Sequence, residues 1–401
     1  MYVSRAGADT AAGYDARMDA QVSPVSRLPD VGVSIFTVMS RLAQEHGAIN
    51  LAQGFPDFDC APALVELAAA WLRRDVNQYA PMAGVPELRQ QLALAFRAAS
   101  GASYDPRTEI TITAGATEAL YAAITALVHP GDEVLLVEPC YDSYVPAVRL
   151  AGGVPRFVPL RHPHYRMDWD DVRRALTDRT RLVVLNSPHN PTGAVFGAAD
   201  LAELAAILER SAAFVVSDEV YEHLVFDGRR HESVASLPAL ASRAVVVGSF
   251  GKSFHTTGWK VGWAAAPAAI SAEIQRVHQF ITFAVNTPLQ HAYAELLRGG
   301  VDLAEVGRFY QRKRDRFLAL IERSRFRPLP CGGTYFLLLD YSAISDEPDG
   351  PMAMRLLQQH GVAAIPTSAF LYDSEAPPVL RFCFAKKEAT LEAAAARLVA
   401  V

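Results

Sequence analysis

Hydrophobic and polar residues alternate along the chain in a way that predicts short buried strands with helices between most of them. Apolar runs typical of strands covered on both faces occupy residues 134–137, 181–185, 213–216 and 245–247. Segments with apolar positions at helical spacing separate most of these runs. Strands and helices in alternation predict an α/β fold built on a doubly wound, mostly parallel sheet.

Helical patterns also flank this region. Residues 34–47 and 62–74 predict two amphipathic helices, and residues 303–323 predict a long one. Beyond that helix, short strands combine with helices, which is typical of a smaller α+β domain. We therefore expect two domains, a large one over residues 62–297 and a small one assembled from residues 29–61 and 298–401.

Composition limits the function classes. The chain has 401 residues, is 51% hydrophobic and carries a net charge of −5, with no Lys/Arg-rich run and no unbroken apolar stretch long enough to span a bilayer. We expect a protein that binds neither nucleic acid nor membrane. The four cysteines lie far apart without a C-x-x-C pair, which favours a reduced, cytoplasmic setting without disulfides or a metal site. Residues 1–28 lack apolar periodicity and are expected to be a disordered leader.

Candidate chemistry centres on Lys252. The strand at residues 245–247 leads through a small-residue turn to this lysine, which should stand in a crevice at the strand's carboxyl end. An ammonium that loses hydration has a lowered pKa, and a neutral amine can form a Schiff base with a carbonyl, for which pyridoxal phosphate is the obvious candidate. A solvated loop lysine is the alternative interpretation. Ser249 and Lys252 also fit the S-x-x-K pattern of β-lactamase-like hydrolases, but the S-D-N and K-T-G partners are absent.

Polar residues at other strand ends could serve such a cofactor. Asp218 follows a buried strand, where it either pairs with a pyridinium nitrogen or caps a helix; both interpretations remain open. Tyr221 and Asn190 could donate hydrogen bonds to the ring oxygen. Tyr141 offers a flat face for stacking on the ring.

Two glycine-containing turns are further candidates. A small-residue turn leads straight into a strong helix, so that the N–H groups of Ala116 and Thr117 and the Thr117 hydroxyl suit a phosphate dianion. Such turns are also common as ordinary helix caps. At Gly54 and Phe55 a tight bend allows a ligand to approach the backbone, although an ordinary linker turn fits the pattern equally well.

Taken together, the stretches INLAQGFPDFD, NQYAPMAGVPELR, TAGATEALYAAI, NPTG, SDEVYEHL and SFGKSFHTTGWKVG resemble the class I, pyridoxal-phosphate-dependent aminotransferases of fold type I. The branch with methionine and kynurenine aminotransferases is the most similar, and the resemblance covers nearly everything after the leader. It implies a large doubly wound domain with a smaller α+β domain, and a homodimer with shared active sites.

The resemblance also implies roles for individual residues. Lys252 matches the Schiff-base lysine, Asp218 the partner of the pyridinium, and Tyr221 and Asn190 the donors to the ring oxygen. Further cofactor contacts fall on Gly115, Ala116, Thr117, Tyr141, Ser249, Lys260 and, from the second subunit, Tyr79. Many family members carry Arg where this chain has Lys260, which replaces a bidentate grip on the phosphate by a point charge.

Substrate contacts are expected at Gly54, Phe55, Asn190, Phe283 and Arg381. Arg381 lies in an alternating strand between apolar neighbours, a place where an arginine needs an anion, and the family uses it to bind the substrate α-carboxylate. The pocket wall expected from GFPDF and QFITFAV holds Phe55, Phe283 and Ala284 but no second cation. We therefore expect transamination of apolar, thioether or aromatic amino acids such as methionine, phenylalanine and kynurenine rather than of aspartate.

Two rival functions share the fold. A cysteine-conjugate β-lyase would use the same lysine chemistry with a leaving group on the β carbon, and only its products distinguish it. A cofactor-binding transcriptional regulator would need a DNA-binding module, for which a leader of about 28 residues without a basic recognition helix is too short.

Overall fold

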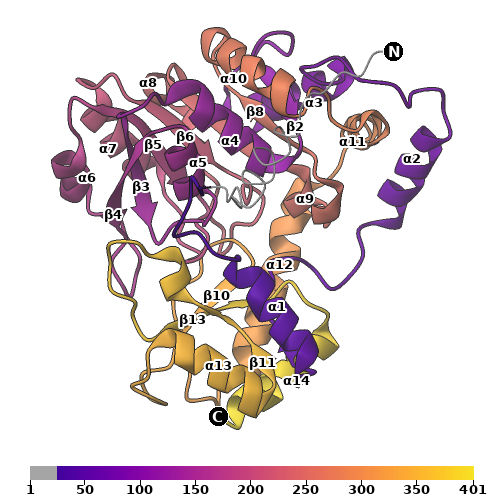
Figure 1. Cartoon of the computed structure of the whole chain (residues 1–401). Helices are drawn as coiled ribbons and strands as arrows, with labels where there is room; N and C mark the ends of the chain where they lie inside the picture. The colour runs from indigo at the N-terminus through magenta and orange to yellow at the C-terminus, as the bar shows by residue number, and fades with distance from the viewer. Residues whose placement is uncertain (1–24) are drawn as a thin grey trace, which may run out of the picture. The chain divides into compact units, whose positions relative to one another are not determined.

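The computed structural model describes residues 25–401, of which residues 33–401 form one compact unit (Figure 1). Residues 1–24, which make up most of the expected leader, lie outside the described part of the chain. The compact unit holds three sheets of seven, four and two strands. No helix within residues 25–401 is long and apolar enough to cross a membrane.

The seven-stranded sheet is mostly parallel, as the strand pattern predicts. In spatial order its strands are β2 (Ile110–Thr113), β8 (Gly262–Ala265), β7 (Ala244–Ser249), β6 (Phe214–Asp218), β5 (Thr180–Asn186), β3 (Glu133–Glu138) and β4 (Val154–Pro159). The strands from β7 to β4 in this order pair in parallel, while β8 runs antiparallel to both of its neighbours, β7 and β2.

Sequence patterns did not predict β4 and β8. The edge strand β4 contains two prolines and has mostly exposed or half-buried residues, so it lacks an apolar run. The strand β8 is short and small, Gly-Trp-Ala-Ala, and its identity depends on pairing with β2 and β7. Both misses have the same physical reason, because pairing within the folded sheet, rather than an apolar pattern of their own, defines these strands.

Helices cover both faces of the sheet and bury alternate residues of each central strand. Val245 and Val247 belong to one apolar core and Val246 to the other, which explains the unbroken apolar run. The first core contains α4 (Gly115–Leu127), α5 (Tyr144–Leu150) and α10 (Ala268–Ile281). The second contains α3 (Pro86–Ser100), α6 (Trp169–Ala175), α7 (Ala198–Leu208), α8 (Pro238–Ala241) and α11 (Thr287–Arg298).

A third core joins the beginning and the end of the described chain. The sheet β12 (Ile365–Pro366), β13 (Val379–Cys383), β10 (Phe336–Asp340) and β9 (Arg327–Pro328) is antiparallel, and β1 (Ile49–Asn50) pairs in parallel with β11 (Val362–Ala363). Helices of this core are α1 (Ile35–Glu45), α12 (Leu303–Leu320), α13 (Asp349–His360) and α14 (Glu388–Val399). The remaining elements are α2 (Pro62–Leu72), α9 (Phe250–Ser253), η2 (Val234–Ser236), η3 (Thr257–Trp259) and η4 (Thr367–Phe370).

These observations confirm the fold class predicted from the sequence, an α/β fold with a large mixed sheet and helices around it. The boundaries of the two expected domains stay a prediction, because residues 33–401 separate from the preceding chain as a single unit. All four cysteines are free, and Cys140 and Cys383 are buried as expected of small apolar side chains.

Candidate active site

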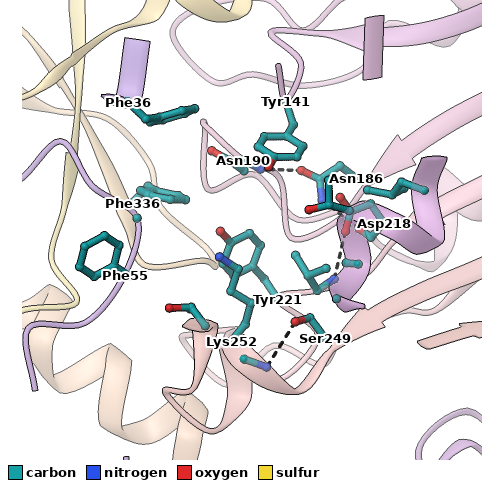
Figure 2. Close-up of a pocket in the computed structure, with 18 of the residues that line it drawn as sticks. Phe36, Phe55, Tyr141, Asn186, Asn190, Asp218, Tyr221, Ser249, Lys252 and Phe336 are labelled. Carbon is teal, nitrogen blue, oxygen red and sulfur yellow. Dashed lines mark hydrogen bonds between the residues drawn. The ribbon is translucent and has the colours of Figure 1, made fainter. Parts of the chain in front are cut away.

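A pocket of about 300 Å³ lies at the carboxyl ends of β5, β6 and β7, where parallel sheets place their ligands (Figure 2). Most of the residues expected at the site line it. They are Gly54, Phe55, Gly115, Ala116, Thr117, Tyr141, Asn190, Asp218, Tyr221, Ser249, Lys252, Lys260 and Arg381. Sequence reasoning did not single out Phe36, Gln53, Leu120, Asn186, Val220, Gly251, Thr257 and Phe336, which also line it.

Lys252 stands in the pocket because β7 turns directly into α9 at its carboxyl end. The Ser249 hydroxyl caps this short helix by accepting from the Gly251 N–H at 3.3 Å. Lys252 Nζ donates to the Tyr335 hydroxyl at 3.0 Å. Burial lowers the pKa of Lys252 to about 8, so that its neutral form is far more populated near physiological pH than that of a solvated lysine. The solvated-loop interpretation of Lys252 is wrong.

Asp218 ends the neighbouring strand β6 and is 4% exposed. The Tyr144 hydroxyl donates to its Oδ2 at 2.7 Å, and the Val220 N–H donates to Oδ1 at 3.3 Å. Burial raises the pKa of Asp218 to about 6 despite these donors. The Asp218 side chain thus makes local hydrogen bonds, yet it remains a buried carboxyl group to which a cationic partner would be favourable.

The beginning of α4 forms a cradle of backbone donors. Its N-cap residue, Ala114, provides no side-chain cap, so the first N–H groups of the helix remain available to a ligand. Gly115 has φ +73, and a Cβ there would lie 3.2 Å from Lys260 Nζ. A Cβ on Gly262 would approach the Ala116 nitrogen to 2.7 Å. The lysine and the helix start are therefore packed closely, which suits a phosphate dianion.

Asn190 and Arg381 meet across the pocket although 191 positions separate them in sequence. Arg381 Nη1 donates to Asn190 Oδ1 at 2.7 Å, and Arg381 Nη2 donates to the Ala52 carbonyl at 3.2 Å. The Asn190 amide oxygen is therefore engaged, and its NH₂ group is the part available to a ligand. Asn190 is held in turn by its backbone N–H, which donates to Asn186 Oδ1 at 2.7 Å (Figure 2).

Arg381 is 1% exposed, and burial lowers its pKa to about 10. Its guanidinium carbon lies 3.9 Å from the ring centroid of Phe336 and 5.0 Å from those of Phe36 and Phe370. Its Nε has no hydrogen-bond partner within residues 25–401. A buried cation held by neutral carbonyls and aromatic faces provides a binding site for a carboxylate.

Aromatic side chains form the wall beside Arg381. Figure 2 shows Phe36, Phe55 and Phe336 on the side of the pocket opposite Asp218 and Ser249. Lys252, Lys260 and Arg381 are the cationic side chains that line the pocket within the described part of the chain. Tyr221 is buried and Tyr141 is half-buried, and desolvation raises the pKa of both hydroxyl groups.

Two residues expected at the site lie outside this pocket. Tyr79 is 80% exposed and Phe283 is 46% exposed, and their rings contact each other edge to face with centroids 5.3 Å apart. Ala284 likewise does not line the pocket. Phe283 therefore does not contribute to the pocket wall of its own chain, and Phe36 and Phe336 stand there instead. Phe36 and Phe336 reach the pocket wall only because segments distant in sequence fold together, and the local sequence pattern does not reveal such contacts.

Three polar residues that sequence reasoning missed hold the functional side chains in place. Tyr144 holds Asp218, Asn186 holds the Asn190 backbone, and Tyr335 accepts from Lys252. Tyr144 and Asn186 lie in the strand-end stretches EPCYDSY and NSPHNPTG, so their positions were a usable signal. Tyr335 follows a Gly-Gly-Thr turn directly before β10 in the four-stranded sheet, and no sequence motif there indicated that it reaches the pocket.

The chain is similar in sequence to known aminotransferases. Residues 46–398 match the family model described as aminotransferase class I and II. The chain is 52% identical to methionine aminotransferase of Escherichia coli strain K12, over 94% of this chain and 97% of that protein. It is 34% identical to kynurenine–oxoglutarate transaminase of Dictyostelium discoideum, over 92% and 94% of the two chains.

The fold is similar to a solved structure over the same range. The crystal structure of YbdL from Escherichia coli, for which a methionine aminotransferase function is described, superposes with a TM-score of 0.93. The two chains are 51% identical, and the match covers 95% of this chain and 100% of the other.

Proposed function

This chain belongs to the class I and II aminotransferases, and from that premise we propose that it transfers the amino group of apolar, thioether or aromatic L-amino acids to a 2-oxo acid. The family membership makes it a transaminase that uses pyridoxal phosphate. The observation that carries the substrate proposal is Arg381, buried against the rings of Phe36 and Phe336.

The residues of the pocket fit the cofactor. The uncapped start of α4, with Lys260 packed against Gly115, would hold the phosphate. Asp218, a buried carboxyl group, would hold the ring nitrogen as its cationic partner. Tyr221 and the NH₂ group of Asn190 would donate to the ring oxygen, Tyr141 would stack on the ring, and Ser249 would add a phosphate contact.

When bound, pyridoxal phosphate supplies the carbonyl that condenses with an amine and the ring that accepts electrons from the substrate's α carbon. Lys252 is the proposed attachment point and the proposed general base. A lysine whose pKa burial lowers to about 8 has a lone pair available at neutral pH, and Nζ can take the α proton and return it elsewhere. The Asp218 carboxylate would keep the ring nitrogen protonated by pairing with its positive charge.

Substrate selection would come from one cation and one apolar wall. Arg381 would bind the α-carboxylate with its guanidinium fork, while Phe36, Phe55 and Phe336 would contact the side chain. Lys260 and Lys252 are assigned to the cofactor, which leaves no described cation of this pocket for a second carboxylate. Burying an unpaired carboxylate would cost several kcal/mol, whereas a thioether or aromatic ring gains roughly 1.5–3 kcal/mol by leaving water.

We propose in addition that the enzyme is a cytoplasmic homodimer in which Tyr79 reaches the phosphate bound by the partner subunit. Tyr79 contacts Phe283, and Phe280 is 85% exposed in the same stretch as Ile281 and Phe283. Exposed aromatic residues gathered in this way are typical of a protein interface. The division into a large domain over residues 62–297 and a small domain over residues 29–61 and 298–401 is part of the same proposal.

The test of substrate class is kcat/KM for methionine, phenylalanine, kynurenine and aspartate with one common 2-oxo acid, because this ratio reports differential transition-state binding. Methionine and the aromatic amino acids should exceed aspartate. If aspartate is the best of the four, a cation from a second subunit enters the pocket and the proposed substrate class is wrong.

A further inference from the structure

The hydroxyl of Tyr335 interacts with Lys252, the Gly54 carbonyl and the Tyr221 hydroxyl, and the directions of the first two hydrogen bonds follow from the chemistry of the partners. Lys252 Nζ donates to Tyr335 Oη at 3.0 Å, and Tyr335 Oη donates to the Gly54 carbonyl. A carbonyl oxygen can only accept, so the single phenolic proton is committed to Gly54. The oxygen of Tyr335 therefore meets Lys252 with lone pairs alone.

The direction of the hydrogen bond between Lys252 and Tyr335 decides whether Lys252 can act as a base. A neutral amine has two N–H groups and one lone pair, and Lys252 uses an N–H to reach Tyr335. A hydroxyl that donated its proton to the amine would instead occupy the lone pair, the only part of the group that can accept a proton from a substrate. The Gly54 carbonyl prevents that arrangement because it already holds the phenolic proton.

Packing fixes the hydroxyl in place. Tyr335 is 0% exposed, and its ring lies edge-on to those of Tyr221 and Phe336, with centroids 5.2 Å and 4.9 Å away. Tyr310 packs against it at 5.6 Å. Lys252 Nζ lies 5.6 Å from the ring centroids of both Tyr221 and Tyr335. The amine is therefore held between two buried phenol rings of fixed orientation.

We propose that Tyr335 is a positioning residue for Lys252, whose free amine it holds by one N–H so that the lone pair of Nζ is directed into the pocket. The inference rests on the proposed function, in which Lys252 is the base. It adds a task for the Gly54 carbonyl, which fixes the donor direction of Tyr335 while the same turn contributes Gly54 and Phe55 to the pocket wall.

Other groups also act on the amine, and a titration must take them into account. Burial has the largest effect on the pKa of Lys252 and lowers it. Cys383 and Asp218 raise this pKa, whereas Lys260 and Arg381 lower it further. Removing the Tyr335 hydroxyl leaves all of these groups in place, although it also takes a hydrogen-bond partner from the Tyr221 hydroxyl. The direction in which the titration of Lys252 shifts in Tyr335→Phe therefore reports whether Lys252 donated the lost bond.

The experiment uses the full-length protein freed of cofactor, and measures the rate at which acetic anhydride modifies Lys252 as a function of pH, by mass spectrometry of the peptide that contains it. In Tyr335→Phe the midpoint should move down by about one pH unit, because the ammonium loses a hydrogen-bond acceptor. A midpoint that moves up would mean that Tyr335 donates to the lone pair, and an unchanged midpoint would mean that the bond is not made. Either result overturns the proposal.

Tyr310→Phe is the matched control. Tyr310 is a buried neighbour in the same ring cluster, and its hydroxyl has no hydrogen-bond partner within residues 25–401. Its removal should leave the midpoint unchanged. If Tyr335→Phe does not fold, site-specific incorporation of 3-fluorotyrosine at Tyr335 keeps the ring and weakens the oxygen as an acceptor, and it should shift the midpoint in the same direction by a smaller amount.

A second measurement separates positioning from a purely structural role. In the enzyme loaded with pyridoxal phosphate, Tyr335→Phe should lower kcat about tenfold with little change in KM, and the α-deuterium isotope effect should increase. A raised KM with an unchanged isotope effect would contradict positioning of the base. The lysine titration needs no turnover, so it remains interpretable even if the proposed substrate class is wrong.

Discussion

The two ends of the pocket stabilise buried charge in different ways. At the sheet end, Asp218 ends β6 and Lys252 lies in α9, directly after the adjacent parallel strand β7, and each favours the charged form of the other. At the aromatic end, Arg381 is held by carbonyl oxygens and ring faces, and one of its donors has no partner in the described chain. Lys252 compensates only part of the buried charge of Asp218, which still lacks a close cationic partner, whereas the aromatic end lacks an anion for Arg381.

The strongest test of the sheet end is Lys252→Ala. The variant should lose the visible absorption of the lysine-bound cofactor and at least about 10⁴-fold in kcat, because both the attachment point and the general base are removed. The absorption spectrum and single-turnover rates with methionine measure the two effects. Circular dichroism should show an intact fold, and full activity in this variant would end the assignment of Lys252.

Asp218→Asn tests the cost of burying the carboxyl without a cofactor. Burial raises the pKa of Asp218 in the folded protein to about 6, above the usual aspartate pKa of about 3.9. The contribution of Asp218 to stability is therefore fully present below about pH 4 and is lost as the pH rises through 6. The variant lacks this titration. In cofactor-free protein, the free energy of unfolding of the variant minus that of the wild type should therefore increase by roughly 3 kcal/mol between pH 4 and pH 8.

Urea unfolding of both cofactor-free proteins at the two pH values measures this difference. Added pyridoxal phosphate should reduce it at pH 8, because the ring nitrogen would supply the missing partner. A difference that is independent of pH would contradict the raised pKa of Asp218.

At the aromatic end, Arg381→Lys keeps the charge but removes the guanidinium fork. We expect kcat/KM for methionine to fall about 10–100-fold, the equivalent of one charge-assisted hydrogen bond. Steady-state kinetics with methionine and with its amine analogue that lacks the carboxylate distinguish the causes. Because the loss should be confined to the carboxylate-bearing substrate, an equal loss for the two compounds would remove Arg381 from the carboxylate site.

The smallest expected effect concerns Tyr79→Phe, which removes one proposed hydrogen bond to the phosphate from the partner subunit. Cofactor affinity should weaken about tenfold while the sedimentation of a dimer stays unchanged. Tyr372→Phe is a matched control, because Tyr372 is 41% exposed and does not line the pocket. A fully active monomer in sedimentation would contradict the shared site, and an unchanged affinity would contradict the contact.

The sequence determined most of the sheet end by itself. Lys252 follows an apolar strand after a short turn, and Asp218 directly ends another, so local pattern and the rule that parallel strands end at one edge bring both to the same place. The start of α4 was visible for the same reason. The family resemblance then assigned roles to positions that the pattern had already selected.

The sequence also indicated Arg381 and Phe55, but only the tertiary structure decided which other rings complete the aromatic end. Phe36 and Phe336 belong to segments about 300 positions apart, and a side chain's arrival at a pocket wall depends on packing that local periodicity does not encode. Phe283 shows the converse, since its pattern suggested a wall residue but its segment folds toward Tyr79. Tyr335 reaches Lys252 and Gly54 from β10's region by the same long-range packing. Strand ends are fixed by hydrogen-bonded pairing of adjacent strands, whereas this wall exists only after distant segments have packed together.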